Sequence, residues 1–346
     1  MNNGWQGGRL SRRRFALALP LLGAVAWAGP GLARAAGPQR ASRNLMGTRV
    51  DIVADGGDAR QLQAAMEQAF GEMQRLEALL SRYRQDSVVR RLADAAGRHP
   101  VAVPPQVMDV LASARQVWRE SAGAFDPTVG ALSGWHFEPG QHAMPAAADI
   151  AAALRHVDAR QLRLDERACT AYLTERGVAL DLGGIAKLPI LAAGLGVLER
   201  NGVTNALING GGDVLASGRL QGRPWRVGVR DPRAPDKLLG AIAIEGLGIV
   251  ASSGDYERGF VHQGRRLHHV LDPQTGWPTQ GVHGVALLAR DVQAVNGWGT
   301  ALMVQGMAAV PAWSAAHPGV GVLAAGSDGA LWQSTGMQAA LKPVTT

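Results

Sequence analysis

The chain has 346 residues, of which 47% are apolar, and it carries a formal net charge of +7. This length and apolar content are sufficient for a buried core in one large domain or two. Residues 1–35 hold five arginines and no acidic residue, whereas acidic and basic side chains are interspersed through the rest. No basic stripe with interleaved aromatic residues occurs in the sequence, so nucleic acid is not an expected partner.

The amino-terminal residues have the pattern of an export signal. An arginine-rich stretch at 9–14 precedes an apolar run at 15–27, and residues 33–35 (ARA) supply small residues for cleavage. The letters SRRRFAL at 11–17 resemble a twin-arginine signal, which directs folded proteins across the bacterial inner membrane. A membrane anchor is the alternative, but the run is shorter than the roughly 20 residues of a span. We therefore predict a signal over 1–35 and a periplasmic mature protein without stable membrane insertion.

The first half of the remaining chain favours helices. Apolar and polar residues alternate over 47–54, which predicts a strand. Apolar residues then recur at helical spacing, and Pro or Asp-Ser pairs mark the helix starts. These signals predict helices over 58–84, 86–92 and 104–121. Residues 134–150 show neither helical nor strand periodicity and are expected to form a loop.

From about residue 155 short β-rich runs dominate. Glycine or Asp-Pro separates most of these runs, as in strands joined by tight turns. Two helices over 190–201 and 296–304 and a final hairpin at 319–333 complete the pattern. The connections are too short for parallel crossovers, so we predict an α+β fold of mixed or antiparallel sheets with packed helices. One compact unit is expected over 40–340. The predicted strands are 162–164, 171–174, 178–182, 205–209, 214–218, 225–230, 240–245, 249–253, 258–262, 266–271 and 282–289.

Cys169 is the only cysteine of the chain. An intramolecular disulfide is therefore impossible, and a cysteine-based metal site is not expected. A nucleophilic cysteine also needs a neighbouring base and an exposed thiolate. We predict that Cys169 is a small packed residue on a strand.

The densest group of chemically useful residues lies at 251–278. It contains Ser252, Ser253, Gly254, Asp255, two adjacent histidines (His268 and His269) and the turn 272–276. Small hydroxyl residues and glycine leave backbone N–H groups free to meet a phosphate or a flavin edge. Histidine and aspartate supply proton transfer or metal contacts. A polar β-hairpin is the alternative interpretation.

Two glycine-rich turns and one helical pair add further candidates. Residues 181–187 join an apolar strand to a helix through Gly183 and Gly184, and they contain Lys187, one of three lysines. Adjacent glycines let the backbone approach an anion, and a following helix N-terminus favours negative charge. Residues 209–213 form a second such turn. The alternative interpretation is that both segments are turns with a purely structural role.

Asn296 and Thr300 are four residues apart, so their side chains share one helical face. Amide and hydroxyl oxygens are ligands for hard cations and suit magnesium that bridges phosphates. The alternative is a pair of polar residues without function on a helix surface.

Taken together, these motifs resemble the FAD:protein FMN transferases of the ApbE family. The motifs follow the family's order over about residues 40–335, and they lie at 46–48, 123–128, 181–187, 253–276 and 294–306. The resemblance implies an ApbE-like, T-fold-related fold. It also implies an enzyme that cleaves FAD at its pyrophosphate with magnesium. FMN is then joined by a phosphoester to Thr or Ser of a target redox protein, and AMP is released.

The resemblance also implies roles for individual residues. The metal would be held by the Ala186 carbonyl, Asn296 and Thr300. Lys187 would stabilise developing negative charge, and His269 or Asp255 would accept the hydroxyl proton. FAD would be bound by Met46, Gly47, Thr48, Phe125, Asp126, Asp181, Gly183, Gly184, Ser253, Gly254, Asp255 and His269.

Three positions depart from the family pattern. Asn296 stands where relatives usually carry Asp, Leu188-Pro189-Ile190 replaces a usual Gly-Tyr and later Asp, and Ala93 replaces a common Asn. Loss of an anionic ligand lowers magnesium affinity. Asn296 therefore favours an alternative function, a non-catalytic periplasmic FAD-binding accessory or carrier protein for an electron-transfer complex. A scaffold whose glycine turns are structural is the third possibility.

Overall fold

The structure, a computed structural model, describes residues 37–138, 140–256 and 258–344. These described residues belong to one compact unit. The predicted export signal at 1–35 lies outside the described residues. Within the described ranges, every helix is too short or too polar to cross a membrane.

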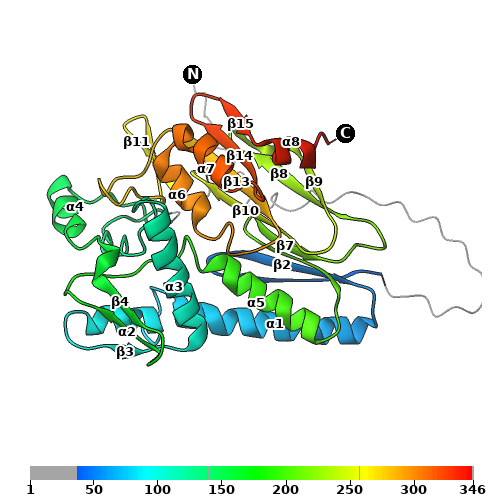
Figure 1. Cartoon of the computed structure of the whole chain (residues 1–346), viewed down its shortest axis with the longest axis horizontal. Coiled ribbons are helices and arrows are strands. Elements are labelled where there is room, and N and C mark those ends of the chain that lie inside the picture. Colours follow the sequence, from blue (N-terminus) through cyan, green and yellow to red (C-terminus); the bar gives the residue numbers. More distant parts are fainter. Residues whose placement is uncertain (1–36, 139, 257, 345–346) are drawn as a thin grey trace, which may run out of the picture. The chain divides into compact units, whose positions relative to one another are not determined.

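An eight-stranded sheet forms the centre of the fold (Figure 1). Its order is β1-β2-β6-β7-β10-β13-β14-β15, and each neighbouring pair is antiparallel. Sequential strands are therefore joined by tight turns at several places rather than by crossovers. The strands are β1 (Gln39–Leu45), β2 (Thr48–Asp55), β6 (Asn205–Gly210), β7 (Asp213–Ser217), β10 (Gly248–Gly254), β13 (Val282–Ala289), β14 (Gly321–Gly326) and β15 (Leu331–Gln333).

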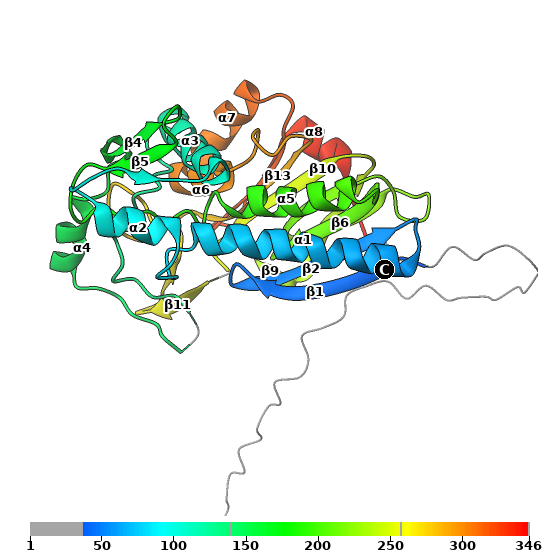
Figure 2. The same cartoon turned by 90° about the horizontal axis from the view of Figure 1, so that it is seen from below.

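Alternating side chains of the central strands supply two separate cores. In β13, Val285 and Leu287 enter the larger core, whereas Ala286 between them enters a second core on the opposite face. Helices cover the larger core, and α1 and α5 lie side by side along it (Figure 2). These helices are α1 (Ala59–Leu80), α5 (Lys187–Arg200) and α6 (Trp298–Gln305).

A small sheet covers the opposite face of the central sheet. It has the order β16-β9-β8 and packs Trp225, Val227 and Ile242 into the second core beside Val214 of β7. Burial on both faces explains why the central strands contain long apolar runs. The covering elements are β8 (Trp225–Asp231), β9 (Ala234–Ile244), α8 (Thr335–Ala340) and β16 (Leu341–Lys342).

The remaining elements surround the ends of α1 and α6. A sheet of order β3-β5-β4 packs against α2 and α3. A third core, which contains Trp135, Phe137, Ile150 and Leu267, joins α4 to the β11–β12 hairpin. The elements are α2 (Val88–Ala95), β3 (Val101–Ala102), α3 (Pro105–Glu120), α4 (Ala147–Leu154), η1 (Ala159–Gln161), β4 (Leu162–Asp165), β5 (Thr170–Leu173), β11 (Gly259–His262), β12 (Arg265–His268), η2 (Met307–Ala309) and α7 (Val310–Ala316).

The predicted α+β class with antiparallel sheets and packed helices is confirmed. Several segments differ from the sequence prediction. The segment 178–182 is not a strand, and only Ala179 forms a single bridge, to Val129. Helix α5 begins at Lys187 rather than at 190, because Pro189 lies in the first turn, where its missing N–H is not needed.

The sequence prediction also missed β1, α4, α7 and α8. Strand β1 is mostly exposed and polar, so it shows no alternation until it pairs with β2. Helix α4 buries only Ile150 among its alanines, so it has no apolar period. Helices α7 and α8 are one to two turns long, which is too short for a periodic signal.

Candidate functional site

The predicted site residues gather at one end of the central sheet. In its antiparallel order, the β1–β2 turn, the β6–β7 turn and the end of β10 all lie at this end. The β1–β2 turn consists of Met46 (φ 54°) and Gly47 (φ 68°), both left-handed. This conformation is unfavourable for methionine. It is held because Met46 N–H donates to Glu77 Oε1 at 2.7 Å and Arg258 Nη2 donates to the Met46 carbonyl at 3.4 Å.

A buried carboxylate connects the next turn to helix α5. Asp213 Oδ2 lies 3.1 Å from Lys187 Nζ, and its Oδ1 accepts the Ser252 N–H at 2.8 Å. The preceding Gly211 lies against Thr48, and a Cβ at Gly211 would be 2.5 Å from Thr48 Oγ1. These contacts place the Lys187 ammonium beside the backbone of β10 and close to the β1–β2 turn.

The N-termini of α5 and α6 meet at this end of the sheet. A Cβ at Gly184 would lie 2.8 Å from Thr300 Oγ1 and 3.2 Å from Phe125 Cε2. Gly299 lies similarly close to the Ser253 hydroxyl. Each helix N-terminus carries unpaired N–H groups and a partial positive charge. The N-termini of α5 and α6 and the Lys187 ammonium together form a site suited to an anion.

Asn296 is buried next to this meeting point. Its side chain is 2% exposed, and its Nδ2 has no hydrogen-bond partner among the described residues. The following Gly297 lies against Ile185, and the neighbouring Ala186 carbonyl accepts the Ile190 N–H. In the described part of the chain, no group of three or more His, Cys, Asp or Glu is arranged to hold a metal ion. The three cation ligands predicted from the sequence, at Ala186, Asn296 and Thr300, are neutral oxygens.

The two adjacent histidines have different environments. His268 is buried, its Nε2 donates to the Thr279 carbonyl at 2.8 Å, and burial lowers its pKa. It is therefore a neutral structural residue. His269 is exposed, and its Nδ1 lies 3.3 Å from the Arg258 carbonyl. Desolvation of the ring by neighbouring residues, and next the positive charge of Arg258, lower the pKa of His269 to about 4.

Two predicted carboxylates are already engaged. Asp255 Oδ2 lies 2.6 Å from His283 Nδ1. Asp126 accepts N–H groups of Thr128 at 2.7 Å and Ala159 at 3.0 Å, and burial raises its pKa. The contacts of Asp126 hold its own turn and η1 together. Its neighbour Phe125, not Asp126, contacts Gly184.

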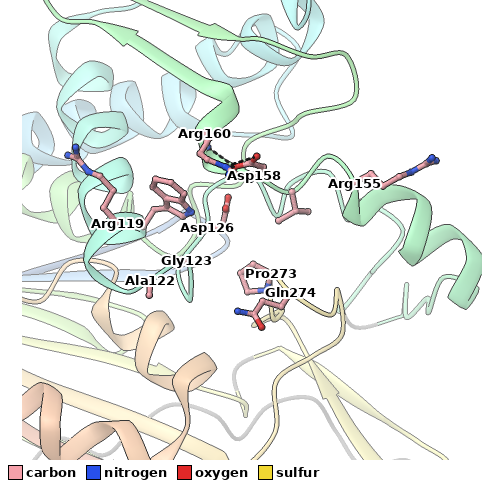
Figure 3. Close-up of a pocket in the computed structure, with 11 residues that line it drawn as sticks. Arg119, Ala122, Gly123, Asp126, Arg155, Asp158, Arg160, Pro273 and Gln274 are labelled. Carbon is pink, nitrogen blue, oxygen red and sulfur yellow. Dashed lines mark hydrogen bonds and ion pairs between the residues drawn. The ribbon is translucent and has the colours of Figure 1, made fainter.

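Asp126 also borders a hollow of about 650 Å³. Figure 3 shows Asp126 beside the Asp158–Arg160 pair, with Pro273 and Gln274 across the hollow. Arg119 and Arg155 extend away on opposite sides. None of the residues that line this hollow belongs to the two helix N-termini. The hollow is therefore distinct from the meeting point of α5 and α6.

Asp181 lies at the edge of the site and pairs with Arg82, which the sequence prediction did not single out. Arg82 Nη1 lies 2.5 Å from Asp181 Oδ2, and Asp181 Oδ1 accepts the Gly183 N–H at 2.8 Å. Tyr83 is 70% exposed beside Arg82. Glu77 was also missed. No sequence motif marks Glu77 or Arg82. Tyr83, an aromatic residue just beyond the end of the long helix α1, could have been singled out as a site candidate from the sequence.

Comparison with known proteins identifies the family of this chain. A family model described as the ApbE family matches residues 46–324, which include all five motifs. The chain belongs to the ApbE family. The resemblance seen in the sequence is thereby confirmed.

Among ApbE relatives, an FAD:protein FMN transferase of Klebsiella pneumoniae is 37% identical over 218 residues, or 62% of this chain and 67% of that protein. One of Treponema pallidum is 32% identical over 247 residues, or 67% and 68%. The ApbE protein of Thermotoga maritima superimposes with a TM-score of 0.79 at 30% identity and covers 88% and 99% of the two chains. The flavin transferase ApbE of Vibrio cholerae gives 0.75 at 25%, covering 88% and 100%.

The contact of Gly184 with Thr300 can be tested by a double-mutant cycle. Gly184→Ala is expected to destabilise this ApbE protein by about 1–3 kcal/mol, because the added methyl overpacks the junction of α5 and α6. In the Thr300→Ala background the loss should be smaller, since the hydroxyl that meets the methyl is gone. Urea unfolding measures both. Equal losses in the two backgrounds would show that the residues do not touch.

Proposed function

We propose that this ApbE protein is an FAD:protein FMN transferase. The observation that carries the proposal is the meeting of two helix N-termini and Lys187 at one end of the sheet. That arrangement matches the charge of the FAD diphosphate. The names of the ApbE relatives support the same reaction.

In the proposed reaction, a Thr or Ser hydroxyl of the target protein attacks the FMN phosphorus. The new P–O bond forms while the bond to the AMP phosphate breaks, and the hydroxyl proton passes to a base. Charge moves onto the oxygens of the leaving phosphate. Lys187, fixed by Asp213, and the N–H groups at the starts of α5 and α6 stabilise that charge.

Magnesium is the proposed metal, and the residues present fit it as partial ligands. The Ala186 carbonyl, the Asn296 side-chain carbonyl and the Thr300 hydroxyl are the oxygen donors. The Asn296 Nδ2–H group, which has no partner among the described residues, calls for an acceptor instead. When bound, the cation neutralises charge on the diphosphate. These three residues supply no carboxylate, and oxygens of the phosphates and water would complete the coordination.

His269 is the proposed base. Its Nδ1–H donates to the Arg258 carbonyl, which leaves Nε2 with a free lone pair. Asp255 is the other candidate from the sequence, but its carboxylate is held by His283 and lies near Arg266. His269 is exposed and neutral at pH 7 because of its lowered pKa. It is therefore able to accept a proton from an approaching hydroxyl.

The second candidate function is an FAD carrier that leaves the dinucleotide intact. The neutral side chain at Asn296 favours it, since weak metal binding slows phosphoryl transfer. A redox protein remains the expected partner in both cases, as FMN recipient or as FAD acceptor.

Incubation of the purified protein with FAD, magnesium and a candidate acceptor separates these functions. Transfer predicts a covalent acceptor–FMN adduct by mass spectrometry and an equal amount of AMP. Lys187→Met should lower the transfer rate by about a hundredfold, as for loss of one preorganised charge donor. Retention of intact FAD without AMP would instead favour the carrier.

The pH dependence tests His269. Because only the neutral ring accepts a proton, kcat/KM for FAD should fall with decreasing pH through about 4, the pKa in the free enzyme. The fall in kcat should lie at higher pH, because the bound diphosphate stabilises the imidazolium. His269→Gln should reduce kcat by about a hundredfold or more and remove both acid limbs. Unchanged acid limbs in this variant would exclude His269 as the base.

We also propose that the protein is made as a precursor with residues 1–35 and is exported to the periplasm. The arginine-rich stretch, apolar run and ARA site support this location. The mature protein recovered from the producing cell should begin at Ala36. Peptides that include residues 1–35 in the mature fraction would contradict the proposal.

A further inference from the structure

Asn296 is a buried polar side chain with an unused donor. It is 2% exposed, and its Nδ2 has no hydrogen-bond partner among the described residues. An unsatisfied buried donor destabilises the folded protein. Such a group is expected to gain its partner from a ligand. The ligand must carry an acceptor, and a phosphate oxygen of the dinucleotide is the acceptor that the proposed function supplies.

The charges around Asn296 disfavour a cation on its own. The starts of α5 and α6 meet here through Gly184 and Thr300, and both helix ends carry partial positive charge. The charges of Lys187 and Asp213 are paired with each other. The candidate cation ligands Ala186, Asn296 and Thr300 are neutral. Magnesium, which gives up its water reluctantly, therefore gains little from this site before an anion arrives.

We propose that Asn296 couples magnesium binding to dinucleotide binding. The Nδ2–H group donates to a diphosphate oxygen, and the Oδ1 atom of the same amide faces the cation. Magnesium is then held only with the diphosphate present, and each ligand strengthens the binding of the other by the same factor. This inference rests on the proposed function, because it takes FAD as the ligand.

A carboxylate at this position would act differently. It would attract the cation without the dinucleotide, and it would lack a donor for the diphosphate and repel it. Asn296→Asp should therefore shift the protein from coupled binding to independent metal binding. The substitution replaces the amide NH2 group by one oxygen atom and adds one negative charge, so the packing around residue 296 stays nearly constant.

Calorimetric titration of the purified protein tests this coupling without an acceptor present. Magnesium alone should give no binding heat up to millimolar concentrations, whereas saturating FAD should tighten magnesium binding by about a hundredfold. Chromatography of the FAD after each titration checks that it is intact. This comparison needs no substitution.

Two variants sharpen the test. Asn296→Asp should bind magnesium without FAD about tenfold or more tightly than the unaltered protein, and should bind FAD in EDTA about tenfold more weakly. Gln63→Glu adds the same charge on the exposed face of α1, and it should behave like the unaltered protein in both titrations. Melting temperatures without ligand show whether each variant is folded.

The outcomes separate the inference from the proposed function. Equal magnesium affinity with and without FAD would overturn the coupling even if FMN transfer occurs. So would an Asn296→Asp protein that cannot be distinguished from Gln63→Glu. If the unaltered protein binds no FAD at all, the proposed function fails as well. Coupled binding without FMN transfer would support the inference for an FAD carrier.

Discussion

The site depends on one close approach, that of Gly184 before α5 to Thr300 in the first turn of α6. No side chain larger than hydrogen fits at Gly184 without displacing Thr300 or Phe125. The approach places two helix N-termini at one point, where N–H groups of both helices are available to a single ligand. A single helix end supplies about half a unit charge, and two ends with Lys187 are suited to a diphosphate.

The rest of the fold keeps these helix ends in place. Helices α5 and α6 rest on a sheet that is buried on both faces, since α-helices cover the larger core and the β8–β9 sheet covers the second core. Close packing on two faces leaves the strands little freedom to shift. These strands also restrain the turns at the end of the sheet, which contain Met46 and Asp213. The strained turn at Met46 persists because Glu77 and Arg258 hold it.

Three close pairs of charged or titratable groups lie at the site. Asp213 neutralises Lys187, Arg82 neutralises Asp181, and His283 contacts Asp255. Outside these pairs, His269 is kept neutral by its surroundings, and the Nδ2 atom of Asn296 lacks a hydrogen-bond partner among the described residues. A site with balanced charge and unpaired N–H donors favours an anionic ligand over a free cation. The same preference for an anion underlies both the proposed FMN transfer and the coupled binding inferred for magnesium.

The sequence alone determined the class of the fold, most helices and strands, and the motifs that contain Lys187, Thr300 and His269. These features are local, because helical period, strand alternation and glycine turns depend on neighbouring residues. Only the tertiary structure decided which of His268 and His269 is accessible, and that Asp126 and Asp255 hold structural contacts. It alone identified Glu77, Arg82 and Tyr83, and the unpaired amide of Asn296. Burial and pairing arise between segments that lie far apart in the chain, so no local pattern encodes them.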